Sequence, residues 1–536
     1  MILERRRPHL QLLTLATILS GCSDGDVIIS SPATSNAAAA EVVVLLSAEW
    51  GGSWPAGLDP ATNTTARANL SQMNAIFGGL FQLMASEGND GFEIKGVLAE
   101  AYEIKEDGRT VIIRLREGVR FTDGTPLDAE AVRFNVVRNL NEPCTCSPSG
   151  WPWDKENPVS VLDDRTVALH FSRPYAAVMN AFPVSNINWI ASPTALAEMG
   201  EEEFAIKPVG AGPFKVVSNQ LSTRLVLERN PDYWEKGKPF LDRLVFQSIG
   251  TEQAAYQALL AGDAHVFEGM TSTPLISQAM RDPTLIVTQQ PATSPYVIQL
   301  NTSRPPFDDQ RAREAIYYAT DVDAIRAGLF HNWYPASQTF TGPGSVFHLP
   351  TVDGYRTYDL ERARELIREL GGIRVTLGTL RSFVAEQVVT ALQSQWNEAG
   401  IETSIVTYDV APLIAQFLSG SWEAMLQTAG SYDPEAGPSV SLRFRSDQPY
   451  TGVHDPDLDR MLDRAAATFD PAERERLYRE VSEHISSHAY GVFLFAFAPT
   501  QIAARGIEGP GLTTQIPPIS INAGVLWQDV RLMSRQ

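Results

Sequence analysis

Cysteines, basic residues and long apolar runs are all scarce in this sequence of 536 residues. Three cysteines cannot form a disulfide framework, and their spacing fits no zinc site with four ligands. The 43 basic residues stand against 63 acidic ones, so the formal charge is −20, and no Lys/Arg-rich stripe follows residue 7. A surface that binds nucleic-acid phosphates needs such a stripe, so we expect no nucleic-acid partner. No stretch reaches 18 consecutive apolar residues, which argues against a transmembrane helix.

Motifs of the common enzyme classes are also missing. The sequence contains no His-Glu-x-x-His, no Gly-x-Ser-x-Gly and no Walker loop. Gly51-Gly52-Ser53-Trp54-Pro55 begins like a nucleophile elbow but ends in proline instead of glycine. Gly210-Ala211-Gly212-Pro213 lacks the third glycine of a dinucleotide fingerprint, and its proline removes a donor N–H. We therefore expect neither enzyme activity nor a cofactor.

Two small groups of metal-ligating residue types have simpler explanations than a metal site. His484 and His488 are four residues apart and could face one ion on a helix, but two solvated or partly buried histidines explain the spacing better. Cys144-Thr145-Cys146 lies in a polar, proline-rich stretch, where a loop disulfide or two free thiols fit better than a metal ion. We expect no bound metal.

Residues 1–22 have the pattern of a targeting segment rather than of a folded element. Arg5, Arg6 and Arg7 form a basic start, and residues 10–19 form an apolar stretch too short to span a membrane. The stretch ends in Leu19-Ser20-Gly21-Cys22, which resembles the lipobox of bacterial lipoproteins. That resemblance implies cleavage before Cys22 and a lipid on its thiol; the alternative is an ordinary signal peptide with a chance cysteine.

Residues 23–40 contain little that could be buried. They are mostly Ser, Ala, Asp, Gly, Pro and Thr, and such a composition cannot offset the entropy lost on ordering. We expect a flexible tether between a lipid-anchored cysteine and a folded body. This layout predicts a protein of the bacterial cell envelope, held at a membrane surface on its extracytoplasmic or periplasmic side.

Alternating apolar residues predict strands in the first half of the folded body. The predicted strands are 41–47 (EVVVLLS), 109–116 (RTVIIRLR), 165–171 (RTVALHF), and the hairpin 213–217 with 223–228. Asn219-Gln220 supplies the predicted hairpin turn. Short helices between these strands complete a mixed α/β pattern.

The clearest pattern of alternating strands and helices lies in the second half. A strand at 373–377 is followed by a helix between Ser382 and Gly400 and by a second strand at 401–407. A short helix at 411–419 and a strand at 423–428 complete the run, which predicts a parallel, doubly wound sheet. Further helices are expected over 359–370 and after Asp470-Pro471-Ala472-Glu473, an N-cap sequence.

Seven short stretches, in this order along the chain, resemble a known family of proteins. They are Leu58-Asp59-Pro60, 98–102 (LAEAY), 121–132 (FTDGTPLDAEAV), 209–214 (VGAGPF), 229–234 (RNPDYW), 258–263 (ALLAGD) and 455–459 (DPDLD). Each stretch is a weak signal by itself, but their order behind a lipobox is specific. The sequence resembles the extracytoplasmic solute-binding proteins of ABC transporters of the peptide/nickel type, family 5.

The resemblance implies an α/β, two-lobed periplasmic-binding-protein fold with mixed, doubly wound sheets and a hinge between the lobes. The implied divisions are 1–22 (lipoprotein signal peptide), 23–40 (tether), 41–295 (lobe I, with an extra subdomain at about 80–205), 296–499 (lobe II) and 500–536 (return to lobe I). The chain would cross between the lobes near 296–302 and 497–501. Ligand would lie between the lobes and close them by hinge bending.

The same resemblance implies capture and delivery of a solute without chemistry on it. A di- or oligopeptide is the expected ligand, and a membrane permease and a cytoplasmic ATPase are the expected partners of a monomeric binding protein. Two alternatives stay open. The solute could be an opine, a sugar, a metal chelate or a lipid-like molecule, or the fold could serve an extracytoplasmic sensor or chaperone.

Ligand-binding residues are expected from the family on both sides of the cleft. Peptide-binding members place an Asp in lobe II to pair with the ligand's amine, but the matching position here is Gly430, in Ala429-Gly430-Ser431-Tyr432-Asp433-Pro434. Either Asp433 takes that role or the solute presents no free amine there. Pro183-Val184-Ser185-Asn186-Ile187-Asn188 lacks the arginines of nickel binders. The full set of expected ligand contacts is Trp50, Trp54, Asn188, Trp422, Gly430, Tyr432, Asp433 and Tyr450.

Overall fold

The computed structural model describes residues 40–47, 52–63, 69–85, 92–105, 107–141, 151–289, 294–428, 435, 437–448, 450–497, 500–513 and 524–533. Every described residue belongs to the unit Ala40–Gln536. The predicted signal peptide, Cys22 and most of the predicted tether lie outside the described residues. Within the described ranges, no helix has both the length and the apolar composition needed to cross a membrane.

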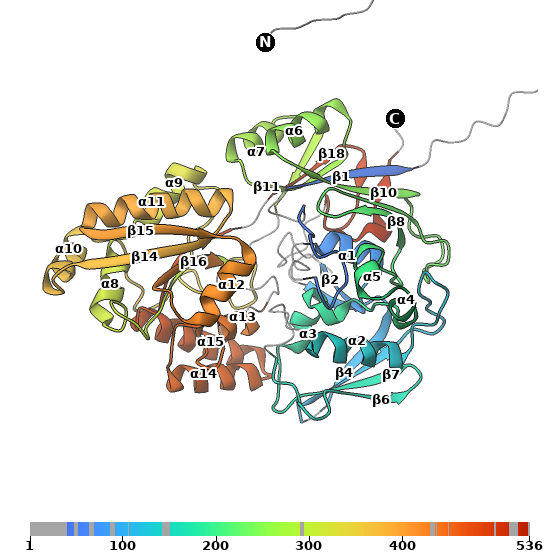
Figure 1. Ribbon diagram of the computed structural model, residues 1–536, viewed down its shortest axis with the longest axis horizontal. Helices are drawn as coiled ribbons and strands as arrows, with labels where there is room; N and C mark the ends of the chain where they lie inside the picture. The colour runs from blue at the N-terminus through green and yellow to red at the C-terminus, as the bar shows by residue number, and fades with distance from the viewer. Residues whose placement is uncertain are drawn as a thin grey trace, which may run out of the picture. The chain divides into compact units, whose positions relative to one another are not determined.

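A seven-stranded mixed sheet begins with the first predicted strand, β1 (Glu41–Ser47). Its other strands are β8 (Phe214–Gln220), β9 (Arg224–Arg229), β10 (Arg243–Ile249), β11 (Val266–Met270), β12 (Leu285–Thr288) and β18 (Thr500–Ala504). Their order across the sheet is β12-β18-β11-β1-β10-β9-β8. Figure 1 labels β18, β11, β1, β10 and β8. Strand β1 is parallel to β10 and to β11, whereas β18 is antiparallel to β11 and β12.

Helices cover both faces of the seven-stranded sheet, which explains why β1 is apolar without interruption. Val42, Val44 and Leu46 pack on one face, and Leu45 packs on the other. The first face is covered by α1 (Leu70–Phe77), α4 (Pro193–Met199) and α5 (Glu201–Ile206), and the second by α6 (Glu252–Ala261) and α7 (Thr273–Ala279). A strand buried on both faces loses the alternation of a half-exposed strand.

The hairpin of β8 and β9 is present, but its turn lies later than the sequence predicts. Asn219 and Gln220 belong to β8, and the turn occupies residues 221–223. The Asn219 side chain accepts a hydrogen bond from Trp54 Nε1 and donates one to the carbonyl of Ile206, both at 2.9 Å. These tertiary bonds hold Asn219 in the strand, so its ordinary preference for turns does not decide the local structure.

A four-stranded antiparallel sheet with its own core lies within residues 80–205. It consists of β4 (Ala99–Ile104), β5 (Thr110–Leu115), β7 (Thr166–His170) and β6 (Val159–Asp163), in that order. Helix α2 (Ala129–Asn141) packs on it, and α3 (Val178–Ala181) and the 3₁₀ turns η1 (Phe182–Val184) and η2 (Asn186–Asn188) adjoin it. We call this sheet, together with α2, α3, η1 and η2, the four-stranded-sheet region. The pair β2 (Phe81–Ala85) and β3 (Phe92–Gly96) stands beside it.

The predicted run of strands and helices forms most of a five-stranded sheet. The strand order is β15 (Ile401–Tyr408), β14 (Ile373–Leu380), β16 (Ala424–Thr428), β13 (Pro295–Leu300) and β17 (Gly491–Ala496). Strand β14 is parallel to β15 and β16, whereas β13 is antiparallel to β16 and β17, so the sheet is mixed. Its first face is covered by α8 (Gln310–Tyr318), α9 (Val322–Phe330), α10 (Leu360–Glu369) and α11 (Phe383–Ala399).

The opposite face of the five-stranded sheet carries three further helices, which we call the helical layer α13–α15. They are α13 (Gly437–Phe444), α14 (Pro456–Ala467) and α15 (Pro471–Ser487). Their apolar side chains pack against Val297 and Phe493, whose neighbours in the strands face the other way. Helix α12 (Val410–Ser419) precedes β16. Two short strands, β19 (Ile507–Glu508) and β20 (Arg531–Leu532), and the turn η4 (Trp527–Asp529) complete the described elements.

The N-cap predicted at Asp470 and the helix start predicted at Ser382 are confirmed, and Asp359 caps α10 in the same way. Asp359, Ser382 and Asp470 each accept a hydrogen bond from the backbone N–H three residues ahead, at 2.8 to 3.1 Å. Gly400 ends α11 in the left-handed conformation, as predicted. The α/β class with mixed sheets covered by helices is therefore confirmed.

Candidate functional site

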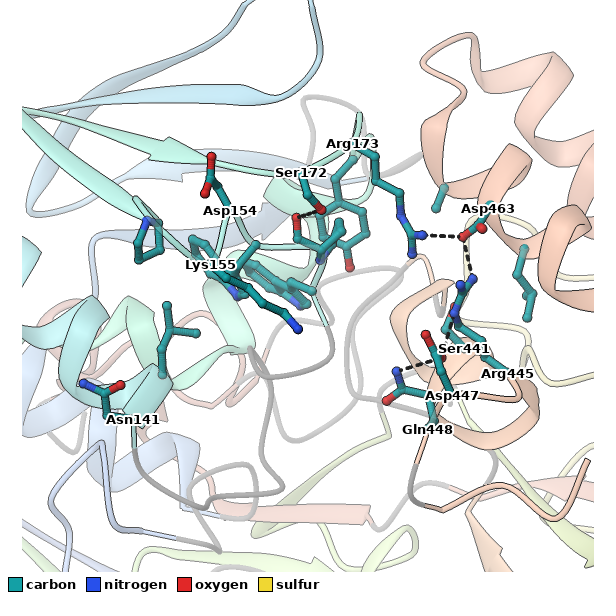
Figure 2. A pocket seen from close by; sticks show the side chains of 18 of the residues that line it. Asn141, Asp154, Lys155, Ser172, Arg173, Ser441, Arg445, Asp447, Gln448 and Asp463 are labelled. Atoms are coloured by element: carbon teal, nitrogen blue, oxygen red, sulfur yellow. Dashed lines mark hydrogen bonds and ion pairs between the residues drawn. The ribbon is translucent and has the colours of Figure 1, made fainter. Parts of the chain in front are cut away.

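A cavity of about 470 Å³ opens between the four-stranded-sheet region and the helical layer α13–α15 (Figure 2). One wall comes from the end of α2 and from residues 151–158 and 172–175. The other wall comes from α13, from residues 445–448 and from α14. A solute in this cavity would contact both regions at once.

The first wall is built on stacked aromatic rings. The indoles of Trp151 and Trp153 lie 5.7 Å apart at an interplanar angle of 15°. Phe171 and Tyr175 pack against Trp151, so both indoles are nearly buried in the core of the four-stranded-sheet region. Rings fixed in this way offer a rigid apolar surface with little rotamer entropy to lose when a solute binds.

The second wall is charged and paired within itself. Arg445 donates to Asp463 at 2.5 Å and to Asp447 at 2.8 Å, and Gln448 also donates to Asp447 (Figure 2). Burial lowers the pKa of Arg445, but the hydrogen bonds to Asp463 and Asp447 and the charges of these carboxylates outweigh burial and raise it above its usual value. The guanidinium therefore holds two carboxylates in fixed positions at the cavity.

Three contacts from residues 173–180 join the two walls, and we call them the 173–180 contact. Arg173 pairs with Asp463 at 2.9 Å, and the Ala176 N–H donates to the Ala466 carbonyl at 2.8 Å. Asn180 Nδ2 donates to Glu435 Oε2 at 2.7 Å. Segments far apart in the sequence are thus held together at the edge of the cavity.

Glu435 is fully buried at this contact and is shared between the two walls. Besides its bond from Asn180, it pairs with Arg474 of α15 at 3.2 Å. Arg474 also donates to the Thr468 carbonyl at 3.0 Å and lies over the ring of Phe347. A buried carboxylate needs such partners, because an unpaired one would cost several kcal/mol.

The lining of the cavity favours binding rather than chemistry. Two buried donors on the first wall, Trp151 Nε1 and Arg173 Nε, have no hydrogen-bond partner within the described part of the chain. Ser172 donates its hydroxyl to the Pro152 carbonyl, which is no base. Aromatic faces beside charges of both signs can hold a polar solute by stacking and hydrogen bonds.

The predicted lobe I residues Trp54 and Asn188 are buried and do not line this cavity. Trp54 Nε1 donates to Asn219, and its ring packs in the core of the seven-stranded sheet. Asn188 accepts a bond from the Phe81 N–H at 2.9 Å and donates to the carbonyls of Phe81 and Pro183. Their role as ligand contacts stays a prediction.

The structure brings the predicted residues Trp422 and Tyr450 together, apart from the cavity lining. Both rings contact Phe417 edge to face, at 5.4 and 5.5 Å, in a small aromatic cluster with Met425. Trp50, Gly430, Tyr432 and Asp433 lie outside the described residues, as do Cys144 and Cys146. Their expected roles stay predictions too.

The cavity residues Trp151, Trp153, Arg173 and Arg445 were not predicted from the sequence. The pattern Trp151-Pro152-Trp153 in a polar stretch was the one available signal, because large aromatic residues beside proline seldom stand free in solvent. No local pattern could indicate that Arg173 meets Asp463, since the pairing depends on how distant segments fold together.

His484 and His488 contact each other, with ring centroids 4.2 Å apart, but His484 is engaged with a carboxylate. Its Nε2 lies 2.6 Å from Asp455 Oδ2. Burial raises the pKa of Asp455, but hydrogen bonds from His484, the Leu458 N–H and Tyr490 outweigh burial and lower it. Among the residues that the structure describes, no three His, Cys, Asp or Glu side chains gather as metal ligands would.

Comparisons with known proteins agree with this architecture. The family model of bacterial extracellular solute-binding proteins, family 5 (middle), matches residues 93–450. The chain is 28% identical over 467 residues to the glutathione-binding protein GsiB of Escherichia coli O1:K1 / APEC, covering 84% of this chain and 87% of that protein.

Two solved structures show the same fold. MoaA of A. tumefaciens R10 in complex with mannopinic acid has a TM-score of 0.77 at 21% identity, covering 93% of this chain and all of that one. DppA of Helicobacter pylori with the peptide STSA has a TM-score of 0.76 at 21% identity, covering 92% and 98%. These neighbours confirm the two-lobed fold, and the matched family and GsiB are solute-binding proteins rather than enzymes. The chain belongs to family 5 of the bacterial extracellular solute-binding proteins.

Proposed function

We propose that this chain is the lipid-anchored solute-binding component of an ABC importer and that it captures a di- or oligopeptide, or a similar small solute, between two lobes. The observation that carries this proposal is the cavity between two regions that have separate hydrophobic cores. A solute bound there adds contacts to both walls and so favours the arrangement in which they meet.

The connectivity supports closure by a hinge. The chain leaves the seven-stranded sheet after β12, forms the five-stranded sheet from β13 to β17, and returns at β18. Two connections between two separately packed sheets allow the sheets to move as units. We propose 41–295 with 500–536 as lobe I and 296–499 as lobe II. The first crossing would lie between β12 and β13, before the stretch 296–302 expected from the sequence, because residues 295–300 form β13; the second would lie between β17 and β18, as expected.

The peptide class is supported by the relatives. GsiB is named for glutathione, and the matched DppA structure holds a peptide. An opine or another non-peptide solute is the second candidate, because the matched MoaA structure holds mannopinic acid and because Gly430 cannot supply a carboxylate to a peptide amine. The permease and ATPase would recognise the closed, loaded form. A sensor or chaperone role would need neither partner.

The first experiment identifies the solute. Mass spectrometry of solute that stays bound through purification, followed by calorimetry with the identified compound, should give a peptide-like molecule. At 100 Kd of ligand, the free energy of unfolding should rise by about 2.7 kcal/mol. The scattering radius of gyration should fall as the lobes close. A bound solute that leaves the radius of gyration unchanged would contradict the hinge.

The second experiment tests the anchor. Cys22→Ser removes the thiol that would carry the lipid, so the variant should leave the detergent phase in phase partitioning or accumulate unprocessed. Ser23→Ala, next to the cleavage site, is the matched control and should partition with the membrane fraction. Identical partitioning of the Cys22 variant and the natural chain would refute lipidation.

A further inference from the structure

Glu268 occupies an unusual position near the carboxyl end of β11. That strand lies beside the parallel strand β1, and Glu268 is level with Leu46, one residue before β1 ends. Because β1 lies between the parallel strands β10 and β11, this edge is where open α/β sheets bind ligands. Every other residue of β11 is buried, whereas Glu268 is partly exposed.

Neutral side chains hold one oxygen of this carboxylate. Ser71 of α1 donates its hydroxyl to Glu268 Oε1 at 2.9 Å, and Gln501 Nε2 of β18 donates to the same oxygen at 3.4 Å. The Ser71 oxygen in turn accepts the Val525 N–H at 3.3 Å, which orients its hydroxyl toward the carboxylate. In the described part of the chain, the second oxygen, Oε2, has no partner.

No cation faces this carboxylate from the described elements that pack around it. Helix α1 and strand β18 contain no charged residue, and β1 contains only Glu41, which pairs with Arg243 at the other end of the strand. In the segment 524–533, Asp529 pairs with Lys238, and Arg531 lies over the ring of Phe240. Glu252 of α6 is bound by Thr271 and Ser272, beyond β11.

Little therefore opposes the effect of burial on the pKa of Glu268. It raises the pKa of Glu268 to about 7, and the Ser71 hydrogen bond lowers it only in part. A carboxylate that lies deep in the protein, keeps some exposure and lacks a cation has the surroundings of a group on the wall of a cleft. Gln501 Oε1 beside it is a buried acceptor without a donor in the described residues. Both unsatisfied atoms require donors.

We propose that Glu268 is the lobe I contact for a cationic group of the solute, an ammonium or guanidinium. Glu268 does not line the cavity of about 470 Å³, so the inference adds a second part of the solute site, at the carboxyl edge of β11. It rests on the proposed function and specifies its solute class. The ammonium supplies several N–H donors to Glu268 Oε2 and Gln501 Oε1 and neutralises the buried charge. In the empty protein below about pH 7, Glu268 carries a proton instead. Binding of the cation then releases that proton to solvent.

Calorimetry with amine probes tests this role. The probes are glutathione and tri-alanine, each with its N-acetylated form, and putrescine. At pH 8, the chain should bind a free-amine peptide at least about tenfold more tightly than the acetylated form, a difference of 1.4 kcal/mol. At pH 6, the heat measured in buffers of different ionisation enthalpy should show release of up to one proton per site. This proton count needs no variant.

Glu268→Gln should abolish both the preference for the free amine and the proton release. Glu228→Gln is the matched control, because Glu228 lies in β9 of the same sheet, half-exposed and paired with Lys215. Its binding should equal that of the natural chain.

The outcomes separate the two proposals. Equal binding of free-amine peptides by the natural chain and by Glu268→Gln would overturn the inference and leave the proposed function standing. Binding of putrescine by the natural chain but not by Glu268→Gln, with no peptide bound, would support the inference and overturn the peptide proposal. Failure of the natural chain to bind any probe would overturn the inference, and the proposed function would still be tested by the solute that stays bound through purification.

Discussion

Two acidic residues deep in the protein, Glu435 and Glu268, have opposite surroundings. Glu435 is fully buried, pairs with Arg474 and accepts a bond from Asn180. Among the described residues, Glu268 is bound only by neutral donors, on one oxygen. A buried charge whose partners belong to the fold is costly to separate from them, whereas a buried charge that lacks such a partner is available to a ligand.

The positions of the two residues fit this difference. Glu435 lies at the 173–180 contact, where it joins the four-stranded-sheet region to the helical layer. Glu268 lies at the carboxyl edge of the parallel strands in the seven-stranded sheet. Removing the partner of Glu435 should therefore damage stability, and removing the charge of Glu268 should relieve a cost.

The largest effect is expected from Arg474→Met. This change keeps an apolar chain over Phe347 but leaves Glu435 buried without its cation. The free energy of unfolding should fall by about 3–5 kcal/mol, measured by urea denaturation at pH 7. Arg476→Met on the same helix is the control, because Arg476 is exposed with Glu473 and Glu480 and should cost less than about 1 kcal/mol. Equal losses of unfolding free energy in Arg474→Met and Arg476→Met would show that Glu435 does not depend on its buried cation, and its contrast with Glu268 would be lost.

The charge of Glu268 should lower the free energy of unfolding, and a comparison of the natural chain with Glu268→Gln at several pH values should show this. Burial raises the folded pKa of Glu268 to about 7 from its ordinary value of 4.5, so the folded state binds the proton more tightly than the unfolded state. The contribution of Glu268 to stability is therefore complete below about pH 4.5 and is lost as the pH rises toward 7.

Relative to Glu268→Gln, the natural chain should lose about 3 kcal/mol of unfolding free energy over that range. Urea denaturation of both proteins at pH 5, 6, 7 and 8, without ligand, measures this difference. Parallel pH profiles would show that Glu268 is not the unpaired acid that the comparison requires.

Asp455 provides an intermediate case, because it is partly buried and well bonded. It caps α14 through the Leu458 N–H and accepts bonds from His484 and Tyr490. Asp455→Asn keeps the cap but weakens the bonds to His484 and Tyr490, so we expect a loss of about 1 kcal/mol at pH 7.

The pKa of Asp455 is lowered, so its contribution should be present above its unfolded pKa and disappear as the pH falls through its folded value. The difference between the two proteins should therefore shrink below about pH 4. Asp457→Asn, an exposed neighbour paired with Arg460, is the control for denaturation at pH 7 and should change stability little. A loss near 4 kcal/mol for Asp455→Asn would contradict this prediction and show that Asp455 depends on its partners as strongly as Glu435 does.

Features encoded within a few residues were predictable from the sequence. The Ser382 cap and the Gly400 end of α11 each depend on bonds to residues at most four positions away. Strand β1 was recognisable because a strand covered on both faces is apolar throughout. The hairpin turn was predicted wrongly because Asn219 takes part in a bond to Trp54, and that partner is distant in the sequence.

The site was less predictable for the same reason. Val266-Phe267-Glu268-Gly269-Met270 shows a single acid in an apolar strand, a signal that sequence reasoning did not use. Even so, nothing local distinguishes Glu268 from Glu435, because their difference lies in what Ser71 and Arg474 contribute from other elements. The periodicity of apolar residues predicts the fold class. Whether a buried acid is paired with a cation depends on residues from other elements, which the local sequence does not show.

The smallest effect is expected from Arg173→Gln, at the exposed edge of the 173–180 contact. Its partner Asp463 keeps the bond from Arg445 at 2.5 Å, so no buried charge is left alone. The loss should stay below about 1 kcal/mol and shrink in 0.5 M salt, as exposed ion pairs do. Urea denaturation at two salt concentrations measures it, with Arg165→Gln, another surface pair, as the control. Arg173 and Glu435 both take part in the 173–180 contact, which joins the four-stranded-sheet region to the helical layer α13–α15. If Arg173→Gln cost as much as Arg474→Met, position at this contact, rather than burial of the charge, would set the loss of stability.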